Sequence, residues 1–401
     1  MSGTDLVILG ATGSVGRSAL EVLDAQSAPQ PLHALTAHRD VAALAELCRR
    51  YRPRVAVVAD ATAIDALRDA LSGTGIAVTG GTDALAEVAA DARVASVLSA
   101  IVGAAGLLPT LSAVRAGKRV LVANKEPLVM AGELFLAEAL ASGAEIVPVD
   151  SEHNAIYQCL PAGYVCGRTP EGVEKLVLTA SGGPFRTWST EAMRTATPEQ
   201  AVAHPNWQMG AKISVDSASM MNKGLEVIEA HWLFAMPHEA IEVVVHPQSV
   251  VHSLVAYRDG SLLAQLGAPD MKIPLAHALG HPERMPSGAR MLDLVAAGDL
   301  TFEPADETRF PCLGLARAAI AQGATAPTVL NAANEVAVEA FLAGRLAFGQ
   351  ISEVIASVLD RAAGGTLPAA TELDAVLRMD DWARDNARAA VSGSKGTTCQ
   401  A

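Results

Sequence analysis

Short apolar runs alternate with amphipathic stretches over the first third of the chain. These runs are only a few residues long and end at turn residues, so we expect strands over 5–10, 31–37, 54–60, 94–101, 118–124 and 144–150. Between the early strands the apolar positions share one helical face, which predicts helices over 14–26, 41–51 and 63–73. Alternating strands and helices at this spacing predict an α/β fold with a Rossmann-like, doubly wound parallel sheet.

The pattern of apolar and polar residues changes after residue 150. Strand-like runs at 173–180, 241–247 and 249–257 are separated by long polar loops, which predicts a central α+β domain with a mixed or antiparallel sheet. After Phe310 the pattern becomes helical, and we expect helices over 313–323, 327–344, 351–363 and 375–392. The sequence shows no internal repeat.

These patterns divide the chain into successive domains. We expect a nucleotide-binding domain at 1–150, a catalytic and dimerisation domain with a flexible loop at 151–285, a linker at 286–310, a C-terminal helical domain at 311–391 and a disordered tail at 392–401.

Composition narrows the classes of partner. Half of the 401 residues are hydrophobic and the formal charge is −13, so the chain can build cores but lacks the basic face that nucleic acids require. Its five cysteines form no CxxC pair. The longest apolar run, between Arg93 and Pro109, is shorter than a membrane helix. We therefore expect a cytoplasmic protein that binds neither nucleic acid nor membrane.

A glycine-rich string, Gly10-Ala11-Thr12-Gly13-Ser14-Val15-Gly16, follows the first strand and opens the first helix. Glycines let a backbone turn tightly and approach a pyrophosphate, whose charge lies at the helix N-terminus. A glycine-rich turn without a ligand is the alternative. The strand–turn–helix context favours a dinucleotide site.

The residues after the second strand are His38-Arg39-Asp40. In such folds a cation there accepts the 2′-phosphate of NADPH, whereas an acid binds the ribose hydroxyl of NADH. Arg39 and His38 favour NADPH, Asp40 favours NADH, and a solvated turn is the third interpretation.

For two further turns, the residues alone do not decide between a ligand-binding role and a purely structural one. Lys125, between Asn124 and Glu126 at the end of a strand, can hold a phosphate or carbonyl oxygen or form a surface salt bridge. Ser181, followed by two glycines, offers a hydroxyl and amides to an anion, but a plain turn has the same composition.

Asp150-Ser151-Glu152 follows the last strand of the first domain. If the segment is extended, Asp150 and Glu152 project to the same side and form a hard-oxygen site for Mg²⁺ or Mn²⁺. An ordinary helix start is the alternative interpretation.

The segment from His204 to Phe234 begins as a polar loop and continues as a predicted helix. On one face of that helix we expect Ser219, Asn222 or Lys223, and Glu226, a set that suits a phosphorylated, metal-bound substrate. A solvated helix face is the alternative. His204 and Trp207 in the loop suggest a lid over the substrate.

Together these motifs resemble the 1-deoxy-D-xylulose 5-phosphate reductoisomerase family. The resemblance covers nearly the whole chain through GATGSVG, AIVGAAGLLPT, ANKE, PVDSEHNAI, SGGPFR, HPNWQMGAKISVDSASMMNKGLE, HPQSVVHS, LAQLGAPDM and LNAANEVAV. It implies a homodimer that uses NADPH and a divalent cation, Mg²⁺ or Mn²⁺ with Co²⁺ as a further candidate. The implied reaction converts the phosphorylated sugar 1-deoxy-D-xylulose 5-phosphate to 2-C-methyl-D-erythritol 4-phosphate, a step of non-mevalonate isoprenoid biosynthesis.

The resemblance also implies roles for individual residues. The metal ligands match Asp150, Glu152 and Glu226, and Lys125 and His204 join them as catalytic residues. Substrate contacts match Lys125, Ser151, Glu152, Ser181, His204, Ser217, Asn222 and Lys223, and further candidate substrate contacts are Trp207 and Glu226. Within this set, the phosphate would be held by Ser181, Ser217, Asn222 and Lys223. Cofactor contacts match Thr12, Gly13, Ser14, Val15, Asn124, Glu126 and Gly210, and further candidate cofactor contacts are His38, Arg39, Asp40 and Lys125. Trp207 and Met209 match the flexible loop. After the second strand the family usually has Gly-Lys-Asn, where this chain has His38-Arg39-Asp40.

Two other classes compete with this interpretation. A metal-free NAD(P)-dependent dehydrogenase, such as a homoserine-type enzyme, explains the glycine-rich start but not the acidic motifs. A nucleotide-sensing regulator would need a broken acid cluster, and Asp150, Glu152 and Glu226 are all present.

Overall fold

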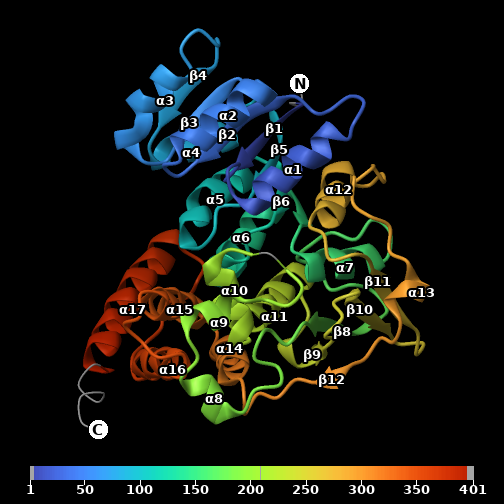
Figure 1. Cartoon of the computed structure of the whole chain (residues 1–401), viewed down its shortest axis with the longest axis vertical. Coiled ribbons are helices and arrows are strands. Elements are labelled where there is room, and N and C mark those ends of the chain that lie inside the picture. The colour runs from blue at the N-terminus through green and yellow to red at the C-terminus, as the bar shows by residue number, and fades with distance from the viewer. Residues whose placement is uncertain (1–3, 208, 395–401) are drawn as a thin grey trace. The chain divides into compact units, whose positions relative to one another are not determined.

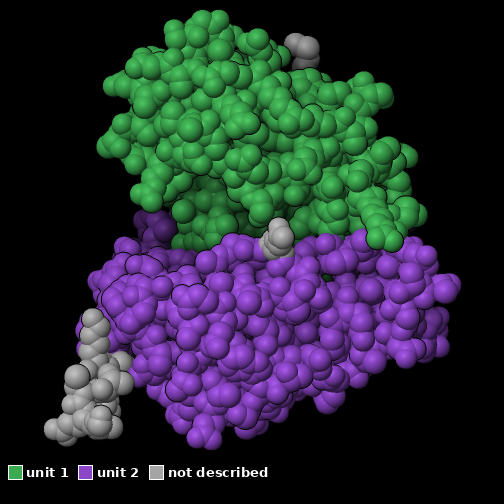
Figure 2. Space-filling view, in the orientation of Figure 1, with its two compact units in different colours: residues 1–127, 135–157, 270–291 green, residues 128–134, 158–269, 292–401 purple. Residues whose placement is uncertain are grey.

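The structure is a computed structural model that describes residues 4–207 and 209–394. The chain forms two compact units, shown in different colours in Figure 2. Unit 1 comprises residues 1–127, 135–157 and 270–291, and unit 2 comprises 128–134, 158–269 and 292–401. The chain passes into unit 2 after residue 157, close to the predicted division at residue 150, but it also crosses between the units after residues 127, 134, 269 and 291.

A seven-stranded sheet forms the centre of unit 1 (Figure 1). Its strands are β1 (Asp5–Leu9), β2 (Leu32–Ala37), β3 (Val55–Val58), β4 (Ala77–Gly80), β5 (Val94–Ser99), β6 (Arg119–Val122) and β7 (Glu145–Pro148). They run parallel in the order β4-β3-β2-β1-β5-β6-β7. The predicted doubly wound sheet is therefore confirmed, with β4 as an edge strand that the sequence pattern did not reveal.

Helices connect these strands. They are α1 (Ser14–Asp24), α2 (Val41–Tyr51), α3 (Ile64–Ala70), α4 (Thr82–Ala90), α5 (Leu107–Arg115), α6 (Glu126–Ser142) and α7 (Ser151–Cys159), with short 3₁₀ turns at Ala61–Ala63 and Ala104–Gly106. The returning helix α12 (Lys272–Gly280) packs against α1, and the Lys272 ammonium lies 3.7 Å from the Glu21 carboxylate. This packing explains why residues 270–291 belong to unit 1.

Unit 2 contains a five-stranded mixed sheet. Its strands are β8 (Val173–Ala180), β9 (Ile241–Val245), β10 (Val251–Tyr257), β11 (Leu262–Leu266) and β12 (Glu303–Pro304), in the order β11-β10-β8-β9-β12. Strands β8 and β9 are parallel and the other neighbours are antiparallel. The prediction of a mixed sheet is confirmed, although β11 and β12 were not predicted.

The remaining helices of unit 2 include the C-terminal bundle. They are α8 (Thr190–Arg194), α9 (Pro198–Val202), α10 (Ala211–Ala218), α11 (Met221–Phe234), α13 (Leu294–Ala297), α14 (Pro311–Gln322), α15 (Ala326–Leu342), α16 (Gln350–Ala363) and α17 (Leu373–Ser394), with a 3₁₀ turn at His238–Ala240. Helix α15 is buried along nearly its whole length and contacts α10, α14, α16 and α17. The four predicted C-terminal helices are confirmed.

The C-terminal end differs from the predicted tail. Residues 392–394 belong to α17, and the rest of the expected disordered tail, 395–401, lies outside the described residues. Within the described residues, none of the helices combines the length and hydropathy needed to cross a membrane.

Candidate active site

The glycine-rich turn lies at the carboxyl end of β1, and α1 begins directly after it. Gly10 has a φ of +84°, and a Cβ atom there would lie 2.6 Å from the Ala100 carbonyl oxygen. A Cβ at Gly16 would lie 2.5 Å from the Gly10 oxygen, so these two glycines allow turn, helix and sheet to pack closely. Gly13 and Ser14 are exposed at the N-terminus of α1. This geometry suits a pyrophosphate.

The second strand ends at an exposed turn, His38-Arg39-Asp40. The Asp40 carboxylate accepts a hydrogen bond from the Ala43 amide at 3.0 Å and caps α2. Hydrogen bonds from Thr62 lower the pKa of neighbouring Asp60, and the charges of His38 and Arg39 lower it further. Asp40 therefore has a structural role as the N-cap of α2, apart from any ribose contact.

The residues after β6 are buried rather than exposed as a surface turn would be. The Asn124 amide donates to the Gly103 carbonyl at 3.1 Å and so ties this turn to the loop after β5. The Lys125 ammonium forms an ion pair with the Asp150 carboxylate at the end of neighbouring β7. Glu126 begins α6. Unit 1 thus brings Lys125 and Asp150 together at the carboxyl edge of the sheet.

The predicted extended conformation of Asp150-Ser151-Glu152 is wrong. Helix α7 starts at Ser151, because the Asn154 amide bonds to the Asp150 carbonyl at 2.8 Å and closes the first turn. The Ser151 hydroxyl donates to the Glu152 carboxylate at 2.5 Å. Alternation along a strand therefore does not align Asp150 with Glu152. Both acids instead lie at the start of a helix, the alternative that the motif left open.

Two residues of this same turn, His153 and Asn154, were not among the predicted site residues. His153 is fully buried, with its Nδ1 atom 4.0 Å from the Asp150 carboxylate. The Asn154 amide donates to the Pro148 carbonyl at 2.8 Å and reaches the His277 Nδ1 atom at 3.0 Å. The two residues follow Asp150 by three and four positions, a spacing that would have indicated them once a helix was assumed. They hold the acidic turn against the end of β7.

A second group of candidate residues lies in unit 2, where the predicted single helix is interrupted. Helix α10 ends at Ala218 and α11 starts at Met221, since Met220 adopts a left-handed φ of 62° between them. Ser219 is therefore not on the same helical face as Glu226, which corrects that prediction. Asn222 and Lys223 both donate to the buried Glu226 carboxylate within α11.

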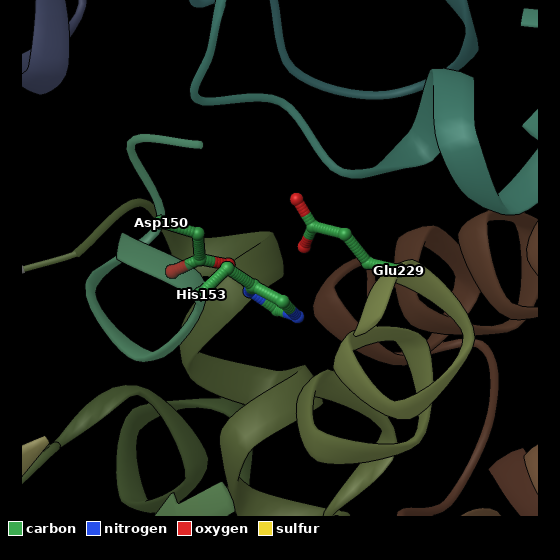
Figure 3. Close-up of side chains that lie close together, drawn as sticks. All are labelled: Asp150, His153 and Glu229. Atoms are coloured by element: carbon green, nitrogen blue, oxygen red, sulfur yellow. The ribbon is translucent and has the colours of Figure 1, made fainter. Parts of the chain in front are cut away.

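Figure 3 shows Asp150 and His153 at the start of α7, and Glu229 on α11. Glu229 lies one turn beyond Glu226 and is also fully buried. Glu229 follows Glu226 by three residues, a spacing that places both side chains on one face of a helix and could have identified Glu229 from the sequence. A helix of unit 2 thus carries two buried acids in successive turns.

Ser181 and His204 form a hydrogen-bonded pair in unit 2. The amides of Asn206 and Trp207 donate to His204 Nδ1 at 3.2 and 2.9 Å, so the neutral ring carries its proton on Nε2. Nε2 lies 2.8 Å from the Ser181 oxygen, which also accepts from the Gly183 amide at 3.1 Å. Since Ser181 accepts both bonds, its own hydroxyl proton is left to be donated to an anion.

Ser217 lies close to the same turn. Gly183 has a φ of +65°, and a Cβ atom on it would approach the Ser217 carbonyl oxygen to 2.6 Å. The turn after β8 and the end of α10 are therefore in direct backbone contact. Ser181, His204 and Ser217 converge on one part of unit 2.

The predicted lid connects His204 to α10. Its Asn206 amide donates to the Pro247 carbonyl at 2.7 Å and to the Ser249 hydroxyl at 3.0 Å. The Trp207 ring lies 6.3 Å from the His252 ring, and Gly210 precedes α10 in an extended conformation. Between them, residue 208 lies outside the described residues. That this loop opens and closes stays a prediction.

Comparisons with known proteins connect these motifs. The chain matches three family descriptions: 1-deoxy-D-xylulose 5-phosphate reductoisomerase over residues 6–132, the C-terminal domain of that enzyme over 146–234, and the DXP reductoisomerase C-terminal domain over 266–386. The 1-deoxy-D-xylulose 5-phosphate reductoisomerase of Cupriavidus pinatubonensis is 56% identical over 386 residues, 96% of each chain. That of Laribacter hongkongensis is 56% identical over 376 residues, 93% of this chain and 97% of the relative.

Solved structures agree in fold over the same length. A DOX-P reductoisomerase in complex with NADPH, fosmidomycin and magnesium has a TM-score of 0.94 at 45% identity, covering 98% of this chain and 99% of its own. The Zymomonas mobilis enzyme in complex with NADPH has a TM-score of 0.88 at 44% identity, covering 97% and 99%. Because identity of this extent runs along nearly the whole chain, the chain belongs to the 1-deoxy-D-xylulose 5-phosphate reductoisomerase family.

Proposed function

We propose that this chain rearranges 1-deoxy-D-xylulose 5-phosphate and reduces the product with NADPH to 2-C-methyl-D-erythritol 4-phosphate, in the presence of a divalent cation. The observation that carries this proposal is the ion pair between buried Lys125 and partly buried Asp150 at the carboxyl edge of the unit 1 sheet. The same edge carries the glycine-rich turn. Open parallel sheets bind ligands at this edge, so one sheet can present a cofactor to charged catalytic groups.

Asp150, Glu152 and Glu226 are the proposed metal ligands. Their donor set fits Mg²⁺ or Mn²⁺, because both ions prefer carboxylate oxygens. Lys125 pairs with Asp150, and Lys223 pairs with Glu226, so each of these two acids has a cationic neighbour. When bound, the cation would chelate adjacent substrate oxygens and polarise the carbonyl as a Lewis acid.

The phosphate of the substrate is assigned to Ser181, Ser217, Asn222 and Lys223. Ser181 has a proton to donate, and Ser217 lies beside the same turn. Lys223 supplies a buried ammonium on α11. Ser151, Lys125 and His204 are assigned to the sugar oxygens, where a hydroxyl, an ammonium and an imidazole can each donate a hydrogen bond.

NADPH is assigned to the carboxyl edge of unit 1. Its pyrophosphate would lie at the N-terminus of α1, on Thr12, Gly13, Ser14 and Val15. Arg39 and His38 would bind the 2′-phosphate, next to Asp40, which caps α2. Asn124, Glu126 and Gly210 complete the proposed contacts. The loop with Trp207 and Met209 would exclude water while the hydride is transferred.

The test is the oxidation of NADPH by purified protein, followed by absorbance, with 1-deoxy-D-xylulose 5-phosphate as substrate. Oxidation is expected only when substrate and Mg²⁺ or Mn²⁺ are both present, and NMR of the product should show 2-C-methyl-D-erythritol 4-phosphate. Oxidation that survives chelation would support the metal-free dehydrogenase. Ligand binding without turnover would support the nucleotide-sensing regulator.

A homodimer is a further part of the proposal. Strand β11 is one edge of the unit 2 sheet and exposes Leu262, Leu263 and Leu266 by 54, 49 and 37%. An exposed apolar edge strand pairs readily with another strand, so a second copy of this chain is the proposed occupant.

Light scattering with size-exclusion chromatography tests this proposal. A dimer is expected for the natural chain and a monomer for Leu263→Lys. Leu140→Lys, which alters a leucine of unit 1 that is 54% exposed, should leave the dimer intact. A monomeric natural chain would contradict the proposal. The cytoplasmic location stays a prediction from the sequence.

A further inference from the structure

The motif Asn331-Ala332-Ala333-Asn334-Glu335 belongs to the family resemblance, but the proposed function gives it no task. It lies on α15, the central helix of the C-terminal bundle, and both asparagines are fully buried. A buried amide loses its bonds to water and therefore needs a partner within the protein. The partner of Asn334 lies outside the bundle.

The Asn334 amide donates to the Asp216 carboxylate at 2.8 Å. Asp216 belongs to α10 and is 1% exposed, and its other carboxylate oxygen lies 2.9 Å from the Lys212 ammonium. One buried carboxylate thus links the first turn of α10 to α15. Hydrogen bonds to an ionised acceptor in a dry environment are the stronger kind, so this contact fixes α10 relative to the bundle.

Helix α10 lies between two proposed substrate elements. Its start follows the lid, and Ser217 comes directly after Asp216. The Asp216 carbonyl accepts from the Ser219 hydroxyl at 3.2 Å, and that hydroxyl accepts from the Met221 amide at 3.3 Å. Asp216 therefore also orders the break that precedes Asn222 and Lys223. A shift of α10 would move Ser217 and the first turn of α11 together.

We infer that Asn334, acting through Asp216, is a positioning residue for the phosphate of the substrate. This inference rests on the proposed function, because it takes Ser217, Asn222 and Lys223 as the phosphate contacts. Neither Asn334 nor Asp216 touches the substrate in this account. They hold α10 in the position from which Ser217 meets the turn of Ser181.

The matched variants are Asn334→Leu and Asn331→Leu. Both variants remove a fully buried asparagine amide from α15. Each also loses one hydrogen bond to a carboxylate, because Asn334 donates to Asp216 and Asn331 donates to Glu335 at 3.2 Å. Asn334→Leu is expected to raise KM for 1-deoxy-D-xylulose 5-phosphate about tenfold, the size of one charged hydrogen bond, while kcat changes less than about threefold. Asn331→Leu should lower Tm about as much as Asn334→Leu does, but it should not raise KM.

A charge-swapped pair tests the contact itself. N334D alone places two carboxylates together and should raise KM more than Asn334→Leu, whereas D216N/N334D restores one carboxylate facing one amide and should recover most of the loss. An unchanged KM in Asn334→Leu, an equal rise in Asn331→Leu, or no recovery in the double variant would overturn the inference.

A second measurement separates this inference from the proposed reaction. Inorganic phosphate is titrated into each protein without metal and followed by ³¹P NMR, which needs no turnover. Weaker phosphate binding in Asn334→Leu than in Asn331→Leu supports the positioning role even if the natural chain does not reduce 1-deoxy-D-xylulose 5-phosphate. Equal phosphate binding in both variants and the natural chain overturns it.

Discussion

His277 offers a quantitative test of how the acidic turn of unit 1 is held. It lies on α12, it is nearly fully buried, and its Nδ1 atom faces the Asn154 amide at 3.0 Å. That amide nitrogen also faces the Pro148 carbonyl, which identifies it as a donor and Nδ1 as an acceptor. The pKa of His277 is lowered from 6.5 to about 4, chiefly by burial and also by the charges of Arg284 and His281.

The consequence for stability follows from proton binding. The native ring stays neutral down to about pH 4, whereas the ring in the unfolded chain takes up a proton near pH 6.5. Stability from this group is therefore complete above pH 6.5 and is lost as the pH falls from 6.5 to about 4. A pKa difference of this size corresponds to about 3 kcal/mol of the free energy of unfolding.

The matched variant is His277→Gln, which keeps an acceptor for Asn154 but does not titrate. The four tryptophans, Trp188, Trp207, Trp232 and Trp382, all belong to unit 2, so fluorescence would miss unit 1. Amide hydrogen exchange in β7 and α12 reports on unit 1 directly. Between pH 6.5 and 4 the natural chain should lose about 3 kcal/mol more opening free energy than the variant. Parallel pH profiles, or an NMR titration of His277 near pH 6.5, would refute the reasoning.

Three predictions concern ligands and are checked by initial rates. Glu226→Gln keeps the side-chain shape but removes a ligand charge, so turnover with Mg²⁺ should fall at least about 100-fold while NADPH binding is retained; near-normal turnover would contradict the metal assignment. Lys223→Ala should raise KM for the substrate at least about tenfold, and an unchanged KM would remove Lys223 from the phosphate site. Asp40→Asn keeps the α2 cap and removes a negative charge beside Arg39. The kcat/KM for NADPH divided by that for NADH should therefore rise about threefold, whereas a lower value would assign the Asp40 charge to NADPH binding.

The sequence predicted the unit 1 sheet well because buried parallel strands are continuous apolar runs. β4, with the residues Ala77-Val78-Thr79-Gly80, escaped prediction because it is a short edge strand with no fully buried position. Strand β11 escaped for a related reason, since an edge strand with exposed leucines lacks the alternation that marks a half-buried strand. The pattern thus identifies strands by their burial.

The candidate residues were found by motif, but their local geometry was not. A left-handed Met220 divides the predicted helix, and no glycine or proline at that position marks the break. The capping bond of Asp40 was likewise not predicted, although the predicted start of α2 at residue 41 is confirmed. Contacts between distant segments, such as Asn334 with Asp216, leave no local pattern at all.

Charge balance links these observations. Buried charges are costly unless they are paired, and Lys223–Glu226 and Lys212–Asp216 lie within unit 2, as Lys125–Asp150 lies within unit 1. Each of these lysines offsets one acid before any ligand arrives, so a phosphate alone would add uncompensated negative charge and a divalent cation alone would add uncompensated positive charge. The proposed ligands carry opposite charges and therefore relieve each other's electrostatic cost. Mg²⁺ should consequently lower the substrate Kd, and saturating substrate should lower the Mg²⁺ Kd by the same factor, because linkage between two binding sites is reciprocal.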